Sequence, residues 1–373
     1  MKILIINHEF PPAGGGAATA CASMAKYLVR EGVEIEVLTS RLKGYPAIET
    51  KDGYSIKRCL GFRQSLCQGS ILEVLFFTIH GFFYFPRRIK NNKPDKVFAF
   101  FSLPSGMLGL FIKRKLKIPY YVFLRGFDVP GFYAGKFSFL NKILKPLIKY
   151  IWINADKIIA NSQSLKELAL KTSRKKEINV IPNGVDTEIF FPSGHKKDSD
   201  KIRLLFVGRL NKQKGLIYLL DSIQKVVQDG FNNFALEIAG EGPETNLLKR
   251  RSETLNIAYK VIFNGWCDRD TLVKKYQEAD IFINPSLDEG MPNAVLEAMA
   301  CGLPIIASDI PAHRELIVKG EEGMLIQIKD YCSLSHAIEL MISNAKLRDK
   351  FEKATLKRAH EHNWKNICHG ILN

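Results

Sequence analysis

The chain has 373 residues, of which 46% are hydrophobic, enough to bury two cores of ordinary domain size. Its seven cysteines are odd in number and show no C-x-x-C spacing, which argues against a disulfide framework or a zinc site and favours a reducing cytosol. The first residues, Met1-Lys-Ile-Leu-Ile-Ile6, lead directly into prolines and glycines. They therefore predict a buried strand and not a signal peptide.

The net charge of +16 is distributed unevenly along the chain. Residues 1–190 carry 29 Lys and Arg against 14 Asp and Glu, or +15, whereas residues 191–373 carry 25 against 24, or +1. This asymmetry predicts that the first half meets a polyanion, either nucleic acid or an anionic membrane face. The apolar segments described below favour the membrane, so nucleic acid is not expected as a partner.

Short runs rich in Val, Ile and Phe alternate with helical segments along the whole chain. This pattern predicts an α/β protein with two Rossmann-like, doubly wound parallel sheets. The expected strands of the first half are Lys2–Asn7, Glu34–Thr39, Lys96–Phe101, Tyr120–Leu124, Lys157–Ala160 and Asn179–Ile181. Those of the second half are Arg203–Val207, Ala235–Ala239, Val261–Phe263, Ile281–Asn284, Pro304–Ala307 and Met324–Ile326. The polar stretch from Phe191 to Lys201 is the expected linker, so the predicted domains are 1–190 and 191–373.

A glycine run, Gly14-Gly15-Gly16, follows the first strand and precedes an expected helix over Ala17–Arg30. Without side chains, the backbone at Gly15 and Gly16 can approach a phosphate or a sugar closely, so both are candidate residues for binding the donor. The run does not fit G-x-G-x-x-G, and no acidic residue follows the second strand where a ribose partner is expected. Binding of a nicotinamide cofactor is therefore not expected.

Two apolar segments of the first half accompany its positive charge. Residues 71–85 are apolar apart from a few polar positions and precede a basic cluster, but they are too short for a membrane span, which needs about 20 residues. The segment Lys136–Trp152 places Lys142, Lys145 and Lys149 at helical spacing against apolar residues, as in an interfacial helix. The alternative is that both segments are core helices with solvated lysines.

In the second half, Arg209 and Lys214 lie just beyond the expected strand Arg203–Val207. Open parallel sheets bind ligands at the carboxyl ends of their strands, so both side chains can reach a ligand there. Two fixed cations would stabilise the charge that develops on a departing diphosphate. The alternative is a solvated surface pair. No D-x-D triplet stands at a strand end, and no metal site is expected.

The most informative segment is Glu289-Gly-Met-Pro-Asn-Ala-Val-Leu-Glu297. Pro292 fits the first turn of a helix and Gly302 fits its end, which predicts a helix over Asn293–Cys301. The preceding loop would direct backbone N–H groups and the positive helix end at one volume, where a diphosphate can rest between two carboxylates that accept hydroxyl bonds. This arrangement suits a nucleoside diphosphate sugar. The alternative is an acidic loop followed by an ordinary amphipathic helix.

The run from Asn284 to Asp309, NPSLDEGMPNAVLEAMACGLPIIASD, resembles the donor-site segment of the retaining glycosyltransferases of family four. Further blocks of the same family occur in its order: Gly14–Gly16, Ile181–Asp186, Val207–Gly215 and Ala239–Pro243. The resemblance spans almost the whole chain and implies the GT-B fold, in which two Rossmann-like domains face each other across a cleft. It implies that the first domain binds the acceptor and the second binds the nucleotide sugar.

The resemblance also implies roles for individual residues. Arg209 and Lys214 would hold the donor diphosphate, Glu289 would bind the transferred sugar and Glu297 the ribose hydroxyls. The backbone of the segment between the two glutamates would cover the sugar and the β-phosphate, through Gly290, Met291, Pro292 and Asn293. The main chain at Cys267 would meet the base, with the neighbouring Trp266 expected in the core or, alternatively, stacked on that base. Transfer would retain the anomeric configuration by a front-face route without a protein nucleophile, a metal or a cofactor.

One position departs from the family pattern. Many relatives carry H-G-x-D after the strand that corresponds to Tyr120–Leu124, whereas this chain reads Arg125-Gly-Phe-Asp128. An arginine cannot act as a base at neutral pH, so any role of Arg125 in the site is one of positioning or charge stabilisation. Arg125 could hold a phosphate or carboxylate of the acceptor, or it could pair with Asp128 in a structural role.

The expected protein is a metal-independent hexosyltransferase of polysaccharide biosynthesis. It would move a sugar from a UDP- or GDP-linked donor to a lipid-linked or cell-envelope glycan, in the cytoplasm at the inner face of the membrane. Two alternatives stay open: a nucleotide-sugar epimerase or hydrolase of the same fold, and a non-catalytic glycan- or membrane-binding subunit. The presence of Arg209, Lys214, Glu289 and Glu297 together argues against the second, because a decayed site has no reason to keep all four.

Overall fold

The computed structural model describes the chain except residues 64–69, 90–91, 133–135, 175, 194–200 and 373. The chain forms two compact units, unit 1 with residues 1–184 and 364–373, and unit 2 with residues 185–363. Most of the expected linker lies outside the described residues. The division falls six residues before the expected boundary, and the carboxyl-terminal segment belongs to unit 1 instead of the second domain.

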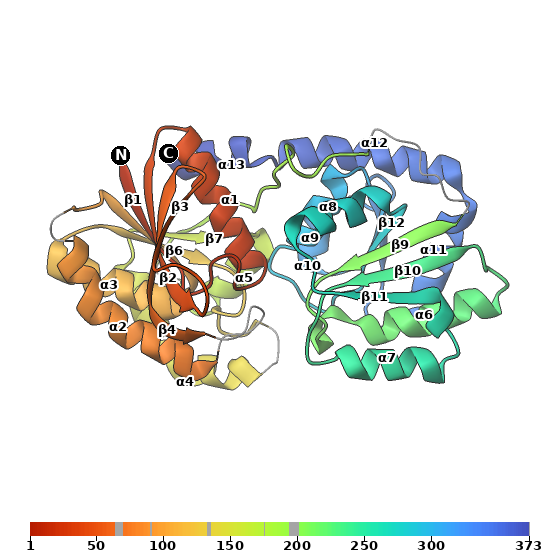
Figure 1. Cartoon of the computed structure of the whole chain (residues 1–373), viewed down its shortest axis with the longest axis horizontal. Coiled ribbons are helices and arrows are strands. Elements are labelled where there is room, and N and C mark those ends of the chain that lie inside the picture. The colour runs from red at the N-terminus through yellow and green to blue at the C-terminus, as the bar shows by residue number, and fades with distance from the viewer. Residues whose placement is uncertain (64–69, 90–91, 133–135, 175, 194–200, 373) are drawn as a thin grey trace. The chain divides into compact units, whose positions relative to one another are not determined.

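Within the described residues, unit 1 is built on an eight-stranded sheet of order β3-β4-β2-β1-β5-β6-β7-β8 (Figure 1). Its strands are β1 (Lys2–Ile6), β2 (Glu34–Leu42), β3 (Ile48–Lys51), β4 (Tyr54–Arg63), β5 (Lys96–Phe100), β6 (Tyr120–Leu124), β7 (Lys157–Ala160) and β8 (Ile178–Val180). Its helices are α1 (Gly16–Arg30), α2 (Ile71–Ile89), α3 (Met107–Leu116), α4 (Lys136–Asn154), α5 (Gln163–Leu170) and α13 (Trp364–Leu372), with a π-helical turn over Phe101–Gly106. Side chains alternate between the two faces of each strand, so one face packs under α2 to α5 and the other under α1 and α13.

Unit 2 is built on a parallel sheet of order β11-β10-β9-β12-β13-β14 among the residues described. Its strands are β9 (Ile202–Val207), β10 (Phe234–Ala239), β11 (Val261–Gly265), β12 (Ile281–Asn284), β13 (Ile305–Ser308) and β14 (Gly323–Ile326). Its helices are α6 (Leu216–Gln228), α7 (Thr245–Thr254), α8 (Arg269–Glu278), α9 (Asn293–Ala300), α10 (Pro311–Arg314), α11 (Tyr331–Ser343) and α12 (Ala345–Glu361). The strand order reverses at β1 in unit 1 and at β9 in unit 2, and such reversals are where α/β sheets bind ligands.

The twelve expected strands are all present, with ends shifted by a few residues. β3 and β4, which extend the unit 1 sheet at one edge, were not expected from the sequence. β4 pairs parallel with β2, while β3 pairs antiparallel with β4. The four residues of β3 are mostly exposed and polar, so they carry no apolar run that would mark a strand.

Helix α13 joins unit 1 because its apolar side chains fill the core beside α1. Trp364, Cys368 and Ile371 are each less than 5% exposed. A Cβ atom built on Gly184 would lie 2.7 Å from the ring of Trp364, so the chain returns to unit 1 where it left. Next to this point the backbone N–H of Val185 donates to the carbonyl oxygen of His362 at 2.8 Å.

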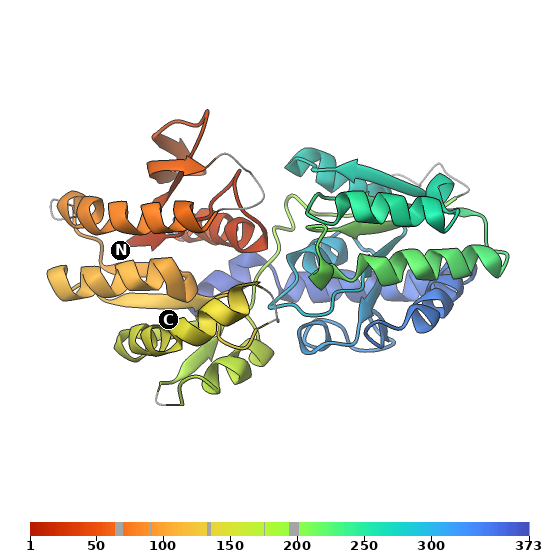
Figure 2. The ribbon, with the colours of Figure 1, turned by 90° about the horizontal axis from the view of Figure 1, so that it is seen from below.

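Helices α2 and α3 lie side by side on one face of the unit 1 sheet (Figure 2). Phe77 and Phe85 of α2 are buried in the core. The outer face of α2 nevertheless exposes a stripe of apolar side chains at helical spacing, namely Ile71, Leu72, Leu75, Ile79 and Phe83, which are 51–77% exposed. No described helix combines the length and the apolar character that crossing a membrane requires.

The three lysines named above lie on the exposed side of α4, while Ile148, Ile151 and Trp152 of the same helix are fully buried. For α4 the structure therefore agrees with a core helix whose lysines are solvated. Among its described residues, α4 also exposes Ile143, Tyr150 and Ile153 beside these lysines.

Because Trp364 anchors α13 in unit 1, replacing it should destabilise the protein strongly. We expect Trp364→Ala to lower the free energy of unfolding by about 3 to 5 kcal/mol. Trp266→Ala is the matched control, since this indole is 48% exposed, and should change stability by about 0.5 kcal/mol or less. Urea unfolding followed by circular dichroism measures both. Equal stability of the two variants would contradict the placement of α13.

Candidate active site

The loops that follow β9, β10 and β12 come into backbone contact at the carboxyl end of the unit 2 sheet. A Cβ atom at Gly215 would lie 2.2 Å from the carbonyl oxygen of Pro285. One at Gly240 would lie 2.0 Å from the carbonyl oxygen of Gly208, and one at Gly242 would meet the loop after β9 just as closely. Gly215, Gly240 and Gly242, which belong to the two motifs Val207–Gly215 and Ala239–Pro243, are therefore required by close packing of loops.

Two further hydrogen bonds fix the loop after β9 to the loop after β12. The side-chain amide of Gln213 donates to the carbonyl oxygen of Asp288 at 2.7 Å. The backbone N–H of Leu287 donates to the carbonyl oxygen of Gln213, also at 2.7 Å. Gln213 is only 5% exposed, so these bonds are shielded from water. They place Lys214, the next residue, against the loop that carries Glu289.

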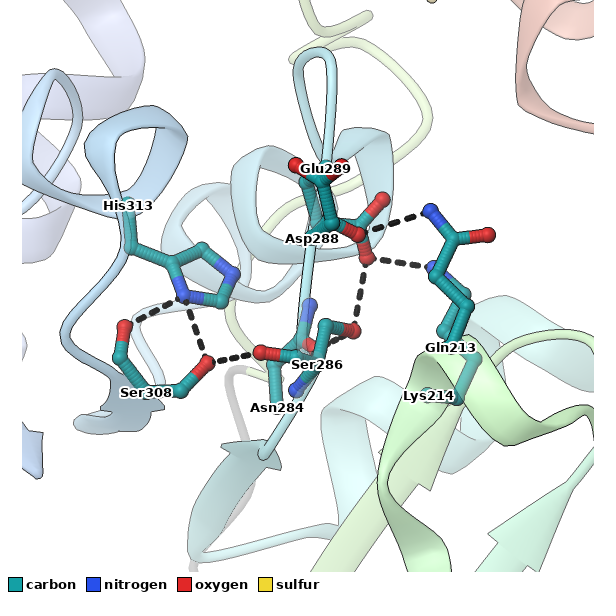
Figure 3. Close-up of polar contacts among 8 residues, drawn as sticks. All are labelled: Gln213, Lys214, Asn284, Ser286, Asp288, Glu289, Ser308 and His313. Atoms are coloured by element: carbon teal, nitrogen blue, oxygen red, sulfur yellow. Dashed lines mark hydrogen bonds and ion pairs between the residues drawn. The ribbon is translucent and has the colours of Figure 1, made fainter. Parts of the chain in front are cut away.

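Lys214 and Glu289 form a largely buried ion pair (Figure 3). The ammonium Nζ lies 2.5 Å from Glu289 Oε1, and the same oxygen accepts a bond from the Ser286 hydroxyl at 2.7 Å. Burial by itself would raise the pKa of Glu289, but the ammonium of Lys214 outweighs it and holds that pKa below its usual range. Glu289 is therefore an ionised acceptor at neutral pH.

Behind this pair lies a second layer of polar groups. Asn284 Oδ1 lies 2.5 Å from the Ser286 hydroxyl oxygen and accepts a bond from the backbone N–H of Ser286 at 3.3 Å. The Ser308 hydroxyl donates to the carbonyl oxygen of Ser286. His313 Nδ1 lies 2.7 Å from the carbonyl oxygen of Ser308, so Nδ1 donates and Nε2 is left as an acceptor in the neutral ring. Burial lowers the pKa of His313, which keeps the ring neutral near pH 7. Figure 3 shows this ring on the side of the cluster opposite Lys214.

Glu297 lies in the first turns of α9, which begins at Asn293 directly after Pro292. Its Oε2 accepts a hydrogen bond of 2.9 Å from the phenol of Tyr276, a residue of α8 that is fully buried. Burial raises the pKa of Glu297, although the bond from Tyr276 opposes this effect. Gly302 has a φ of +77° and follows the end of the helix, as the sequence predicted.

Three other predicted positions of unit 2 lie in the same loops. Arg209 is half-buried in the loop after β9, between Gly208 and Leu210. Cys267 is half-buried after β11, and its thiol lies 3.7 Å from the carbonyl oxygen of Gly265. The expectation of a core indole at Trp266 is wrong, because this side chain is 48% exposed.

The predicted residues of unit 1 form a separate group at the carboxyl ends of its strands. Gly15 caps α1, and Gly16 is its exposed first residue. The Asp128 carboxylate accepts bonds from the backbone N–H groups of Arg125 and Gly126, at 2.9 and 3.1 Å. The side chain of Arg125 does not bond Asp128; its Nη1 donates to Asn183 Oδ1 at 2.5 Å. Asp128 thus shapes the loop and does not pair with the guanidinium.

The structure brings together Lys214 and Glu289, a pairing that was not predicted. It also adds residues that were not expected from the sequence: Gln213, Tyr276, Ser286, Ser308 and His313. Gln213 and Ser286 lie inside the quoted motifs, so their position was a usable signal. Tyr276 reaches Glu297 from another helix, and nothing in its sequence context indicated that contact. Within the described ranges, no group of three His, Cys, Asp or Glu side chains is arranged to hold a metal ion.

Comparison with known proteins gives this geometry a context. The family described as "Glycosyltransferase Family 4" matches residues 14–189, and the family described as "Glycosyl transferases group 1" matches residues 186–358. An uncharacterized glycosyltransferase of Methanocaldococcus jannaschii is 27% identical over 390 residues, covering 100% of this chain and 97% of the relative. The UDP-Gal:alpha-D-GlcNAc-diphosphoundecaprenol alpha-1,3-galactosyltransferase of Escherichia coli is 32% identical over 267 residues, covering 67% of each.

Among solved structures, sucrose-phosphate synthase from Thermosynechococcus elongatus matches with a TM-score of 0.87 and 20% identity, covering 100% of this chain and 97% of that one. At this identity the match is one of fold. It confirms the expected fold class, two Rossmann-like domains of the GT-B type, and the family matches confirm the resemblance drawn from the sequence.

The ion pair between Lys214 and Glu289 generates a prediction on stability. Lys214→Met should lower the free energy of unfolding by about 1 to 3 kcal/mol, because it leaves a carboxylate buried without its cation. Adding Glu289→Gln should recover part of this loss, since the double variant no longer buries an unpaired charge. Urea unfolding of the wild type, the two single variants and the double variant gives the coupling energy between Lys214 and Glu289.

The matched control is Lys225→Met, which breaks an exposed i,i+4 pair with Asp229 on α6 and should change stability little. If Lys214→Met is no more harmful than Lys225→Met, the buried pair does not contribute as described.

Proposed function

Because the chain belongs to glycosyltransferase family 4, we propose that it transfers a hexose from a nucleoside diphosphate sugar, UDP- or GDP-linked, to a lipid-linked or cell-envelope glycan. The observation that carries this proposal is the ion pair of Lys214 with Glu289 at the carboxyl ends of β9 and β12, eight residues before Glu297. The pair supplies a cation and an ionised carboxylate that accepts hydrogen bonds, and Glu297 supplies a second carboxylate nearby in the sequence. All three lie where open parallel sheets bind ligands.

Donor binding follows from the charges of these loops. The ammonium of Lys214 has three donors, so it can keep its bond to Glu289 and also bind a phosphate oxygen. Arg209 adds a planar guanidinium suited to a diphosphate. Glu289 then accepts hydroxyls of the transferred sugar, and Glu297, held by Tyr276, accepts those of the ribose. The backbone of residues 290–293 covers the sugar and β-phosphate, and the main chain at Cys267 meets the base.

The transfer itself requires no protein nucleophile. The bond between the anomeric carbon and the diphosphate oxygen breaks, and the acceptor oxygen bonds to that carbon on the same face, so the configuration is retained. The acceptor proton passes to an oxygen of the leaving diphosphate. Arg209 and Lys214 stabilise the negative charge on this leaving group, as a divalent metal does in other enzymes, so the reaction is metal-independent. The presence of Arg125 in place of a histidine agrees with a route that needs no base from unit 1.

The proposals for the acceptor and for the cellular location are supported by the related proteins and by the surface of unit 1. The related enzyme of Escherichia coli is named for a diphosphoundecaprenol acceptor, which is a lipid-linked glycan. We assign acceptor binding to unit 1 and nucleotide-sugar binding to unit 2. Gly15 and Gly16 of unit 1 are proposed as donor-binding residues. The role is one of polysaccharide biosynthesis in the cytoplasm.

A peripheral position at the inner face of the cell membrane is supported by α2 and its surroundings. Five large apolar side chains on one helix face form a contiguous exposed patch of the kind that marks interaction sites. Exposed basic residues lie on α3, which contacts α2, at Arg114 and Lys115, and on α4, which contacts α3, at the three lysines named above. Apolar side chains with cations around them complement an anionic lipid surface.

The assignment of Arg209 and Lys214 to the leaving diphosphate predicts a loss of turnover. Arg209→Ala and Lys214→Ala should each lower kcat by about 10²-fold or more, because each removes charge stabilisation in the transition state. Transfer of labelled sugar to a membrane-extracted acceptor measures this loss, and activity should persist in excess chelator.

Two controls separate chemistry from folding in this experiment. Circular dichroism at the assay temperature establishes that each variant is folded. The variant Lys214→Met/Glu289→Gln should regain stability without regaining turnover. Normal turnover of both alanine variants would remove the assignment, and loss of donor without any glycosylated acceptor would favour a hydrolase or epimerase.

Membrane association predicts that two sets of changes weaken binding to vesicles with anionic lipid. Replacing Lys142, Lys145 and Lys149 by Gln should reduce affinity about tenfold or more at low salt, since each lysine near an anionic surface contributes about 1 kcal/mol. Replacing Leu72, Leu75 and Ile79 by Ser should reduce affinity at low and high salt alike, because apolar insertion is not screened.

The matched control is the pair Leu247→Ser and Leu340→Ser, which removes two exposed leucines of unit 2. This variant should bind vesicles as the wild type does. Unchanged affinity of both unit 1 variants in vesicle co-sedimentation would contradict the proposed surface.

A further inference from the structure

The guanidinium of Arg125 lies in unit 1 without a carboxylate partner among the residues described. It donates one bond to Asn183 and lies over the ring of Phe100, 4.4 Å from the ring centroid. Its Nε is buried and has no hydrogen-bond partner. Burial lowers the pKa of Arg125 to about 10, so the group is still a cation at neutral pH. A buried cation in a protein is normally paired, which makes this arrangement unusual.

The nearest acid on the same loop does not supply the missing pair. Asp128 already accepts four hydrogen bonds of 2.8–3.1 Å, from the backbone N–H and hydroxyl of Ser102 and from the backbone N–H groups of Arg125 and Gly126. Burial raises the pKa of Asp128. Its carboxylate therefore holds the loop. It stabilises the Arg125 cation electrostatically, but none of its hydrogen bonds comes from the guanidinium.

Two buried amides share the face and edge of the sheet on which Arg125 stands. Leu124 of β6 is in register with Ala160 of β7, so Arg125 and Asn161 follow as neighbours. Side chains alternate between the two faces of a strand. Asn7, Arg125 and Asn161 directly follow β1, β6 and β7, and by this alternation each lies on the face of the sheet that packs against α1 and α13. Asn7 Nδ2 and Asn161 Oδ1 are buried and have no partner.

These neighbours also meet through α1. The thiol of Cys21, in the second turn of α1, lies close to the side chain of Asn7 and interacts electrostatically with Arg125. The unpaired set therefore comprises two donors, Arg125 Nε and Asn7 Nδ2, and one acceptor, Asn161 Oδ1. Unpaired buried polar groups each cost about 1 to 3 kcal/mol, and their concentration at one edge is better explained by a ligand than by packing.

We propose that Arg125, Asn7 and Asn161 form an anion subsite of unit 1 that binds a phosphate or carboxylate of the acceptor, with a hydroxyl of the same molecule donating to Asn161. That the ligand is the glycosyl acceptor rests on the proposed function. The guanidinium Nε–H and the amide Nδ2–H donate to the anionic oxygens, and the Asn161 oxygen accepts from the hydroxyl. A charge-assisted bond of this kind is shorter and stronger than a neutral one.

The test uses the whole chain and inorganic phosphate as the probe, with UDP present at saturation so that the phosphate-binding loops of unit 2 are occupied. The Nε–H signals of the arginines are followed by nitrogen-15 NMR, and the Arg125 signal is assigned by its absence in Arg125→Lys. We expect phosphate to shift this signal in a saturable way. Arg125→Gln should weaken phosphate binding about 10- to 100-fold, the effect of losing a hydrogen bond to a charged group.

Arg114→Gln is the matched control, since Arg114 is an exposed arginine of the same unit, and it should bind phosphate as the wild type does. The proposal is overturned if phosphate leaves the Arg125 signal unmoved, if Arg125→Gln binds phosphate equally well, or if the signal moves only at molar concentrations. If UDP alone moves the signal as phosphate does, the anion belongs to the donor and the acceptor assignment fails.

Sugar transfer by the same variants distinguishes this proposal from the proposed function. Arg125→Glu should lose well over tenfold in activity and Arg125→His less, because a carboxylate repels an anionic acceptor whereas an imidazole keeps a donor. A phosphate-induced shift in a protein that transfers no sugar would leave the anion subsite standing while the proposed function fails. Equal transfer by the His and Glu variants would place Arg125 outside the acceptor site.

Discussion

Close backbone contact between loops, permitted only by glycine, is the constraint on which the unit 2 site depends. Gly215 lets the loop after β9 approach the carbonyl oxygen of Pro285, and the loop after β10 makes similar contacts through Gly240 and Gly242. A Cβ at any of these positions would overlap a backbone atom, so the loops would have to separate. Lys214 would then lose contact with the segment that carries Glu289. The cluster of charges is thus a consequence of how tightly the backbone packs.

The two units treat buried charge in opposite ways. In unit 2 the carboxylate of Glu289 has a cation at 2.5 Å and a hydroxyl at 2.7 Å, which together lower its pKa in spite of burial. In unit 1 the guanidinium of Arg125 has an amide and an aromatic face but no carboxylate among the described residues. A paired charge contributes to a preformed site, whereas an unpaired one favours the arrival of a ligand of opposite sign.

Much of the fold followed from local patterns, and so did part of the site. The apolar runs located β1, β2 and ten other strands, and Pro292 with Gly302 located the helix that carries Glu297. Of the missed strands, β3 is the edge strand and has little apolar signal, whereas β4 lies inside the sheet and buries Tyr54, Ile56 and Cys59. The burial expected for Trp266 was wrong because an aromatic residue in a loop after a strand has no periodic pattern to place it.

The sequence by itself determined that the chain has two Rossmann-like sheets, which loops bear the charged residues, and which family it belongs to, because periodicity, glycine positions and short motifs are local properties. The tertiary structure decided which side chains meet. Tyr276 reaches Glu297 from another helix, Arg125 bonds Asn183 across 58 residues, and Trp364 returns to Gly184 in unit 1. Such contacts depend on how whole helices and strands pack. The free energy of that packing comes from many residues of the core together, so no single segment of the sequence predicts the contacts.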